Sequence, residues 1–522
     1  MNLVERIAKW VGVDVTAVNR PELVAFRETM DAARASKRAE EYAEALDAFE
    51  RAGKLCEQTG DVMALSVVRL HMADIYTRLG QFEDAQMYIN LVLRSGDGVY
   101  PTAPRAYAKV ALGVLQLARG EHDAARDTLD DAAATARKAK SPGAEGRAMG
   151  YLAGTYLRDG NASYAAHLLR EALPKLNMAG DLELSAPFIT MLAEALLATG
   201  ETVEADTLLS RGVRLAEQIK SRGDLRRLHM VQAKRALDLG HYAESYNQYE
   251  KALQFTNENA PERPQVLREV ATACLYLDKS QDALVYAERA VELQPDDPAL
   301  RGTLGVILQS IGRPDDALPN LKAAILAPET NYDTLRALAA AYVDTKRYDN
   351  GLKTLETALE LAKRADLPLE EARTLRDIGH LHLRERRHPE AIKAWTQAVD
   401  LYEGKNIYSQ AARLLCDIAG ARLQLGQTTR AYKDYEQALM LVNGADDITT
   451  RGVVLSNAAM VYVEKGDLET AEAFFTEAIQ IAQKTHDAPA EATRRGNFGW
   501  FLLNTGRYER AQTALQFALE LE

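Results

Sequence analysis

The chain has 522 residues and a net charge of −12, with 75 acidic and 63 basic side chains. This balance argues against a nucleic-acid-binding protein, because phosphates require a basic face. Hydrophobic residues make up 47% of the chain and charged residues 26%, as in an ordinary soluble protein, and no run of about 18 apolar residues predicts a transmembrane segment.

The N-terminal region, residues 1–20, begins with a short amphipathic segment. Apolar residues recur at helical spacing over residues 1–13, with charged residues on the opposite face. We interpret it as a capping helix that covers the apolar face of the next element. A helix that docks on a membrane surface or on a partner is the alternative.

From residue 21 onward the chain repeats one unit, which is clearest at residues 455–478. Two apolar runs at helical spacing flank a break at Gly466 and Asp467. Gly466 can adopt the left-handed conformation that ends a helix, and Asp467 can cap the next helix. This pattern predicts a helical hairpin with an apolar face that only another hairpin can cover.

Twelve further copies of the hairpin can be recognised by a small residue at the position equivalent to Ala471. The same position is occupied by Ala45, Ala85, Ala125, Ala165, Ala205, Ser245, Ala283, Ala317, Gly351, Ala391, Ala431 and Ala511. The step is 40 residues, except for 38, 34 and 34 between Ser245 and Gly351. Twelve residues earlier every copy has Ala or Gly, and five residues earlier nine copies have Gly. The sequence therefore predicts thirteen hairpins whose helices cross closely at small residues.

This pattern resembles the tetratricopeptide repeat family, whose repeats have an Ala…aromatic…Ala second helix and a period of about 34 residues. The 40-residue copies are similar to the extended repeats of kinesin light chains and Pins-type adaptors, with a Gly-Asp turn at Gly60-Asp61 and Gly180-Asp181. The resemblance implies an all-α solenoid with a right-handed superhelix. For function it implies protein or peptide binding.

The repeat spacing divides the chain into four regions. After residues 1–20, repeats one to six occupy 21–260 with a constant step, the compact repeats seven to nine occupy 261–362, and repeats ten to thirteen occupy 363–522. The period first changes near residues 257–264, which contain turn-forming residues.

Signs of catalysis are missing from the sequence. It contains no P-loop, no GxSxG and no GxGxxG after a strand, so we expect no enzyme and no cofactor. His380 and His382 are two residues apart on a predicted helix and point in different directions, so we expect no metal site. The three cysteines form no CxxC pair, which favours a reducing compartment, and we expect the protein to be cytoplasmic.

In repeats of this kind the first helix lines the inner face of the superhelix. The position two residues before its small residue should therefore face inward. It is occupied in turn by Asp31, His71, Ala111, Tyr151, Met191, Val231, Glu269, Thr303, Ala337, Asp377, Asp417, Asn457 and Asn497. The middle of the first half of this series is apolar, whereas its last four members are polar.

The polar end of the series predicts a groove that binds a partner protein segment. In the extended-repeat adaptors an Asn at this position grips the peptide backbone, which implies the same role for Asn457 and Asn497. The predicted partner-binding residues are Arg373, Arg376, Asp377, His380, Arg413, Asp417, Ser456, Asn457, Asn497 and Trp500. The alternative is a purely structural set, in which arginine and aspartate pair with each other on a wet inner face.

These observations favour a non-catalytic scaffold or adaptor that binds a protein or peptide segment in its concave face. The alternative is a module that senses a ligand or peptide and regulates an effector domain or partner. The last hairpin carries Phe498, Phe501, Leu515 and Phe517, and we expect no further helix to cover them. Exposed apolar surface of this kind favours a homodimer through the last repeat.

Overall fold

A computed structural model describes residues 21–94, 103–326, 332–443 and 447–521. The expected helix within residues 1–20 lies outside the described residues. In the described part of the chain all regular structure is helical. The helices are α3 (Pro21–Arg38), α4 (Tyr42–Thr59), α5 (Val62–Arg78), α6 (Phe82–Arg94), α7 (Ala103–Ala118), α8 (His122–Lys138), α9 (Pro142–Arg158), α10 (Ala162–Met178), α11 (Leu182–Thr199), α12 (Thr202–Gln218), α13 (Arg222–Asp238), α14 (Tyr242–Gln254), α15 (Arg263–Tyr276), α16 (Ser280–Leu293), α17 (Pro298–Ser310), α18 (Pro314–Ala324), α19 (Tyr332–Asp344), α20 (Tyr348–Arg364), α21 (Pro368–Arg384), α22 (His388–Gly404), α23 (Tyr408–Gln424), α24 (Thr428–Asn443), α25 (Ile448–Lys465), α26 (Leu468–Lys484), α27 (Ala488–Asn504) and α28 (Tyr508–Leu521).

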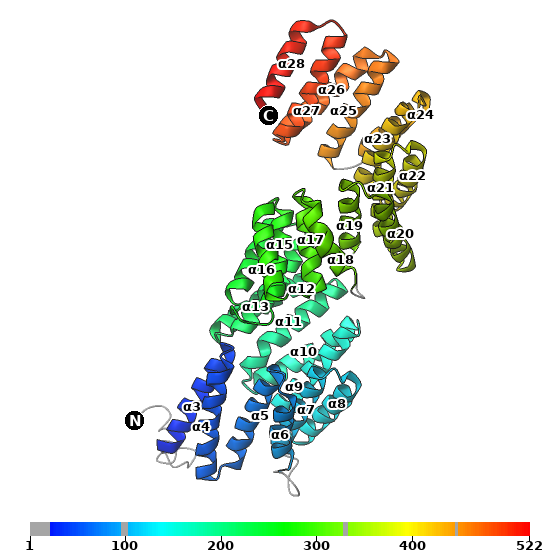
Figure 1. The fold of residues 1–522 in the computed structure, drawn as a ribbon. Coiled ribbons are helices and arrows are strands. Elements are labelled where there is room, and N and C mark those ends of the chain that lie inside the picture. The colour runs from blue at the N-terminus through cyan, green and yellow to red at the C-terminus, as the bar shows by residue number, and fades with distance from the viewer. Residues whose placement is uncertain (1–20, 95–102, 327–331, 444–446, 522) are drawn as a thin grey trace. The chain divides into compact units, whose positions relative to one another are not determined.

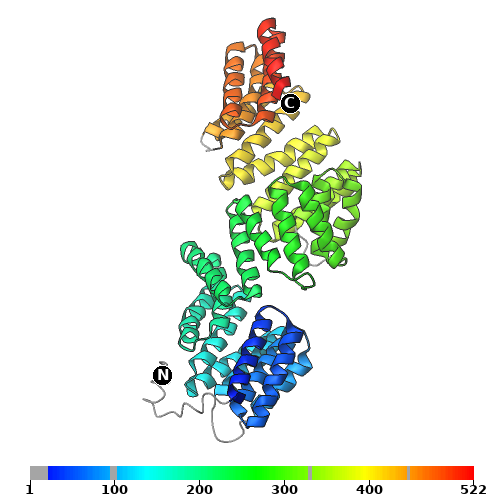
Figure 2. The same ribbon diagram turned by 90° about the vertical axis from the view of Figure 1, so that its left-hand side faces the viewer.

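These helices form thirteen consecutive hairpins, from α3–α4 to α27–α28, whose two members run antiparallel (Figures 1 and 2). The all-α solenoid of thirteen hairpins that the sequence predicts is confirmed. The first helix of most hairpins packs on its own partner and also on the first helix of the next hairpin, as α5 does on α7 and α23 on α25. The first helices therefore form one layer and the second helices another.

The turn inside each hairpin depends on one residue with a positive φ angle. All nine glycines of the repeat pattern adopt this conformation, with φ between 70° and 86°. In the other four hairpins the equivalent residues Glu40, Asp278, Lys346 and Arg386 adopt it at φ between 58° and 64°. After Gly466, the carboxylate of Asp467 accepts a hydrogen bond from the Thr470 amide at 3.2 Å, as the capping pattern predicts.

The small residues lie where the two helices of a hairpin cross. Ala471 and its twelve counterparts are all buried. Twelve residues before Ala391, a methyl group added to Gly379 would lie 2.2 Å from Nε1 of Trp395 on the facing helix. Here only glycine leaves room for the tryptophan, so the columns of small residues are a packing requirement.

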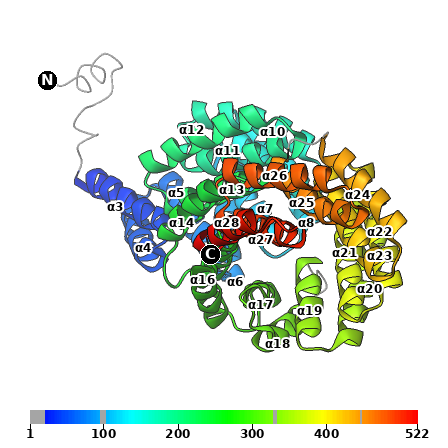
Figure 3. The same ribbon diagram turned by 90° about the horizontal axis from the view of Figure 1, so that it is seen from above.

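The chain divides into two compact units, Met1–Lys279 and Ser280–Glu522. The division falls between α15 and α16, which are the two helices of the seventh hairpin. In the first unit, a large apolar core extends over α7 to α13 and includes the buried Leu169, Phe188 and Leu228. In the second unit the main core surrounds Trp395 and Tyr402, and the helices from α16 to α28 follow a curved path in the end-on view (Figure 3).

Helix α11 is the one helix among the described residues that is long and apolar enough to cross a membrane. Half of the relevant window is buried inside the protein, and Phe188, Ile189 and Leu192 belong to the core of the first unit. Its apolar composition is therefore explained by its position between neighbouring hairpins. The sequence did not single out this helix, because Glu183 and Glu194 interrupt its apolar residues.

Candidate functional site

The ten residues predicted to bind a partner lie on the first helices of the last four hairpins, within the second unit. Helix α21 carries four of them, α23, α25 and α27 two each. We call Asp377, Asp417, Asn457 and Asn497, which occupy equivalent positions on these helices, the polar ladder. Asp417 and Asn457 are exposed, and Asp377 and Asn497 are half-buried.

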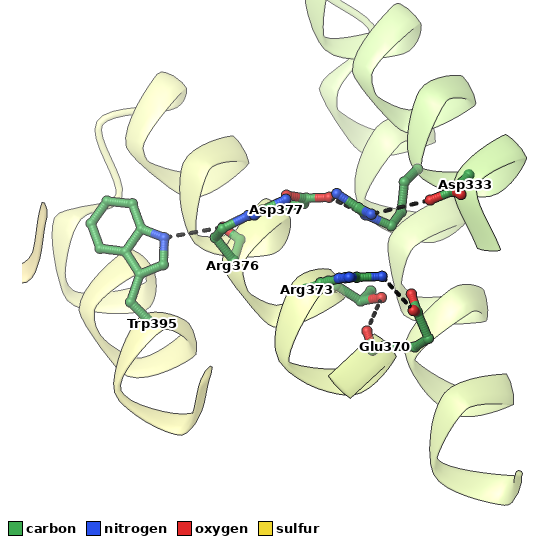
Figure 4. Close-up of polar contacts among 8 residues, drawn as sticks. Asp333, Glu370, Arg373, Arg376, Asp377 and Trp395 are labelled. Atoms are coloured by element: carbon green, nitrogen blue, oxygen red, sulfur yellow. Dashed lines mark hydrogen bonds and ion pairs between the residues drawn. The ribbon is translucent and has the colours of Figure 1, made fainter. Parts of the chain in front are cut away.

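At the α21 end, the charged side chains are paired within the protein (Figure 4). Nε of Arg336, on α19, donates to Oδ2 of Asp377 at 2.5 Å, and Nε of Arg376 donates to the other carboxylate oxygen at 3.0 Å. Arg373 donates to Glu370 at 2.7 Å. The structural pairing that the sequence left open as an alternative is therefore present in this hairpin.

Trp395, on α22, packs against this part of α21 and forms a hydrogen bond with its backbone. Its indole N–H donates to the carbonyl oxygen of Arg376 at 3.0 Å, and its side chain is fully buried. The ring of His380 meets the indole edge-on, with 5.2 Å between the ring centroids. Surrounding protein, with a smaller contribution from Arg376, lowers the pKa of His380, and Asp377 opposes this effect.

The middle of the ladder is different, because Asp417 accepts no hydrogen bond from the described residues. Its carboxylate is reached by water but lies among protein atoms on the inner face, and this desolvation raises its pKa to about 6, with Arg376 acting in the opposite direction. The nearby Arg413 donates instead to Thr450 Oγ1, on α25, at 3.1 Å. Asp417 and Asn457, whose side chain forms a hydrogen bond with the Cys416 thiol, are therefore the most exposed members of the ladder.

At the far end, Asn497 and Ser456 come together, with Nδ2 of Asn497 3.5 Å from Oγ of Ser456. Ser456 is buried, whereas Trp500 is half exposed, at 50%. No ring or hydrogen-bonding contact among the described side chains joins the Trp500 indole to the ladder. The ladder thus runs from a paired end at α21 to an open end with a free aromatic face.

A second concave site lies in the first unit, where the sequence predicted no binding residues. It is a cavity of about 940 Å³ lined chiefly by the first helices of hairpins one to seven. Four consecutive members of the inward-facing series, His71, Ala111, Tyr151 and Met191, are among its lining residues. That series was the signal that could have located the cavity.

Comparisons with known proteins agree with this architecture. Two family models described as tetratricopeptide repeat match the chain, one over residues 332–404 and 450–521 and the other over 70–145 and 376–447. Together they cover just over half of the sequence. The comparison with curated proteins gave no match.

Several solved structures match part of the chain at low sequence identity. The apo form of RapI is 11% identical, with a TM-score of 0.38, and the match covers 57% of this chain and 97% of that one. Aspartyl phosphate phosphatase F from Bacillus subtilis is 16% identical, with a TM-score of 0.39 and coverage of 72% and 93%. A monomeric mutant of IFIT1 with Gppp-AAAA is 15% identical, with a TM-score of 0.43 and coverage of 72% and 90%.

Proposed function

This chain belongs to the tetratricopeptide repeat family, and from this premise we propose that it is a non-catalytic scaffold that binds an extended protein segment along the polar ladder. Proteins of this family are protein-binding repeat scaffolds. The finer part of the proposal is the binding site, which we place on the inner face of α21, α23, α25 and α27.

The observation that carries the proposal is the pair formed by Asp417 and Asn457. These two side chains occupy equivalent positions on adjacent first helices, and both are exposed. An amide donates and accepts at once, and a carboxylate accepts, so the two can bind the backbone groups of an extended chain. Trp500, half exposed, supplies an aromatic anchor beyond Asn497.

The charges around the ladder favour a polar segment of mixed charge. Arg413 is exposed and forms no ion pair with the described residues, so an acidic side chain of the ligand can approach it. Arg373 and Arg376 are engaged with Glu370 and Asp377, and a ligand must compete with these contacts. We therefore expect the tightest contacts at the α23 to α27 end.

Peptides selected from a random display library against the whole chain would test this proposal. The double variant Asn457→Ala/Asn497→Ala should weaken their binding by about 1–3 kcal/mol for each lost buried contact, without a matching loss of thermal stability. The double variant Asn320→Ala/Asn350→Ala, on second helices, is the matched control. Equal binding by all three proteins would contradict the proposed site.

Two further parts of the proposal concern the context of the protein. We propose a cytoplasmic location, supported by three cysteines that are all buried and have no CxxC spacing. We also propose that two copies associate through α28, where Phe517 and Leu519 are exposed. Sedimentation should then depend on concentration, and Phe517→Ser/Leu519→Ser should abolish this dependence; a strict monomer at high concentration would contradict the dimer.

A second candidate function is that of a ligand-sensing regulatory module. The observation that favours it is the cavity of about 940 Å³ in the first unit, which is far larger than the gaps left by ordinary side-chain packing. A peptide-binding scaffold does not require such a cavity. Ligand binding there would be measured independently of peptide binding to the second unit.

A further inference from the structure

The cavity of the first unit is closed by contacts between hairpins that are far apart in the sequence. Arg38, at the end of α3, donates to Glu183 on α11 at 3.2 Å. Glu40, in the turn after α3, accepts from both terminal nitrogens of Arg226 on α13, at 2.8 and 3.1 Å. The first hairpin therefore returns against the fifth and sixth, and these contacts bridge one side of the space between their inner faces.

One wall of this space is apolar. Val110 and Val114 on α7 and Phe188 and Met191 on α11 line it. The edge of Tyr151 packs against the ring of Phe188, with 5.3 Å between the ring centroids. A hydrocarbon or aromatic group placed against this wall would be removed from water, which stabilises binding.

The other walls carry ionic groups that hold one another in place. The carboxylate of Asp74 lies 2.7 Å from Nζ of Lys37 and 3.2 Å from Nε of Arg78, and these cations lower its pKa despite burial, which acts in the opposite direction. Arg147 donates to Asp181 at 2.6 Å and lies over the ring of Tyr107. These side chains are fixed before any ligand arrives.

Positive charge exceeds negative charge in the cavity, although the whole chain is acidic. Seven Arg and Lys residues line it, against five Asp and Glu residues. No acidic side chain of the described residues lies within ion-pair distance of Arg34 or Arg227. His71 adds no charge near neutral pH, because burial and the neighbouring Lys37 hold its pKa well below the usual value.

We propose that this cavity binds a small amphipathic organic anion, whose carboxylate or phosphate group contacts Arg34 and Arg227 and whose apolar part lies against α7 and α11. Guanidinium groups form charge-assisted hydrogen bonds with both kinds of anion. The cavity volume of about 940 Å³ is in the range of sites for small organic molecules. This inference is independent of peptide binding along the polar ladder.

The ion pairs that bridge one side of the cavity favour a small molecule over a protein segment. The ion pairs of Glu40 and Arg38 join α3 to α13 and α11 across the space, and the side chains of Glu40 and Arg226 are only 13% and 12% exposed. A long chain that crossed this side of the cavity would have to break these contacts. A small anion fits inside while they remain closed.

Isothermal titration calorimetry of the full chain with four probes of similar length would test the proposal. Octanoate and octyl phosphate should each bind with one site per chain, and the comparison between them distinguishes a carboxylate ligand from a phosphate ligand. Octanol and octylammonium should bind at least tenfold more weakly, because they lack the negative charge. Failure of both anions to bind at millimolar concentration would overturn the proposal. Binding of octanol and octylammonium as tight as that of the anions would also overturn it.

Two variants locate the binding, each with a matched control. Arg34→Gln/Arg227→Gln should weaken anion binding at least tenfold, whereas Arg211→Gln, on the exposed face of α12, should leave it unchanged. Ala111→Trp should fill the apolar side of the cavity and abolish binding, whereas Ala337→Trp, at the equivalent position of the second unit, should not.

Thermal unfolding of each variant would show whether it is folded, and the charge variant keeps the test decisive if the tryptophan variant is not. Unchanged anion binding by a folded Arg34→Gln/Arg227→Gln protein would overturn the proposal. Asn457→Ala/Asn497→Ala should bind octanoate or octyl phosphate as the wild type does. Failure of the peptide site and failure of the anion site are therefore separate results.

Discussion

Arg226 and Glu40 are 186 residues apart in the chain, yet the guanidinium of one donates to both carboxylate oxygens of the other. A second contact from Arg226 reaches Glu262 at 3.4 Å. Because both members of the main pair are mostly shielded from water, the pair is fixed in one geometry. It joins the first hairpin of the first unit to the sixth.

Removal of one partner should release α3 without unfolding the unit. Glu40→Gln leaves Arg226 poorly paired in a shielded position, which costs about 1–3 kcal/mol. We expect this loss in the local opening free energy of α3, measured by hydrogen exchange, because the helix pairs and core of the unit are unaffected. Arg289→Gln, which removes an exposed pair with Glu292, should change exchange by well under about 1 kcal/mol. Equal effects of both variants would contradict a closing role for the Glu40 contact.

The close approach of α21 and α22 gives a prediction about glycine. Gly379→Ala would bring a methyl group to 2.2 Å from Trp395 Nε1, and such overpacking costs about 1–3 kcal/mol, more than the gain of up to about 1 kcal/mol in helix propensity. We therefore expect a lower melting temperature, together with loosening at Arg376, whose carbonyl accepts from Trp395.

Gly420→Ala is the matched control for this change. Gly420 is also inside a first helix, but an added methyl group there has nothing within 4 Å. The substitution should stabilise the protein by up to about 1 kcal/mol, because alanine favours the helix. Shifts of the same sign at Gly379 and Gly420 would show that helix propensity, and not the approach of Trp395, decides the outcome.

The buried small residues equivalent to Ala471 predict a similar contrast between neighbouring positions. Ala125 is fully buried at the crossing of α7 and α8, whereas Ala124, one residue earlier on α8, is exposed. Ala125→Leu should destabilise the protein by about 1–3 kcal/mol through overpacking, and Ala124→Leu by much less. Denaturant unfolding of both variants measures the difference. Equal, negligible effects would contradict the assigned register.

The local parts of this fold follow from the sequence, because each hairpin is determined by residues close together in the chain. Gly466 and Asp467 stop one helix and start the next, and Ala471 sets the distance between them. Even the four hairpins without the turn glycine are recognisable, since Glu40 and its counterparts lie at the same step. Thirteen hairpins could therefore be predicted from one repeated pattern.

The sites depend on relationships that the pattern does not contain. The contact of Glu40 with Arg226 depends on how far each hairpin rotates relative to the last, a small angle that accumulates over six repeats. Arg336 and Asp377 are in contact but do not occupy equivalent positions, because Arg336 lies one residue earlier in its repeat than Asp377 does. A comparison of equivalent positions alone therefore overlooks this contact. The inward-facing direction of His71, Tyr151 and Met191 was predictable, but the enclosed space between them was not.

Asp417 gives a prediction about pH. Its pKa is about 6 in the folded chain, against an ordinary value of 3.8, because protein atoms around the carboxylate disfavour its charged form. Between these two values the folded state binds more protons than the unfolded state does, so this residue lowers stability as the pH rises from 3.8 through 6. The effect is complete above that range and disappears below it.

Asp417→Asn removes the charge and keeps the shape, so it should raise the melting temperature at pH 8 and have a smaller effect at pH 4.5. The gain is reduced by the water that reaches this side chain, so the test lies in the pH dependence and not in the size of the shift. Melting curves of wild type and variant at the two pH values measure it. A difference that stays constant with pH, or that grows on acidification, would mean that Asp417 is not desolvated on the inner face, and the ladder would lose its most available acceptor.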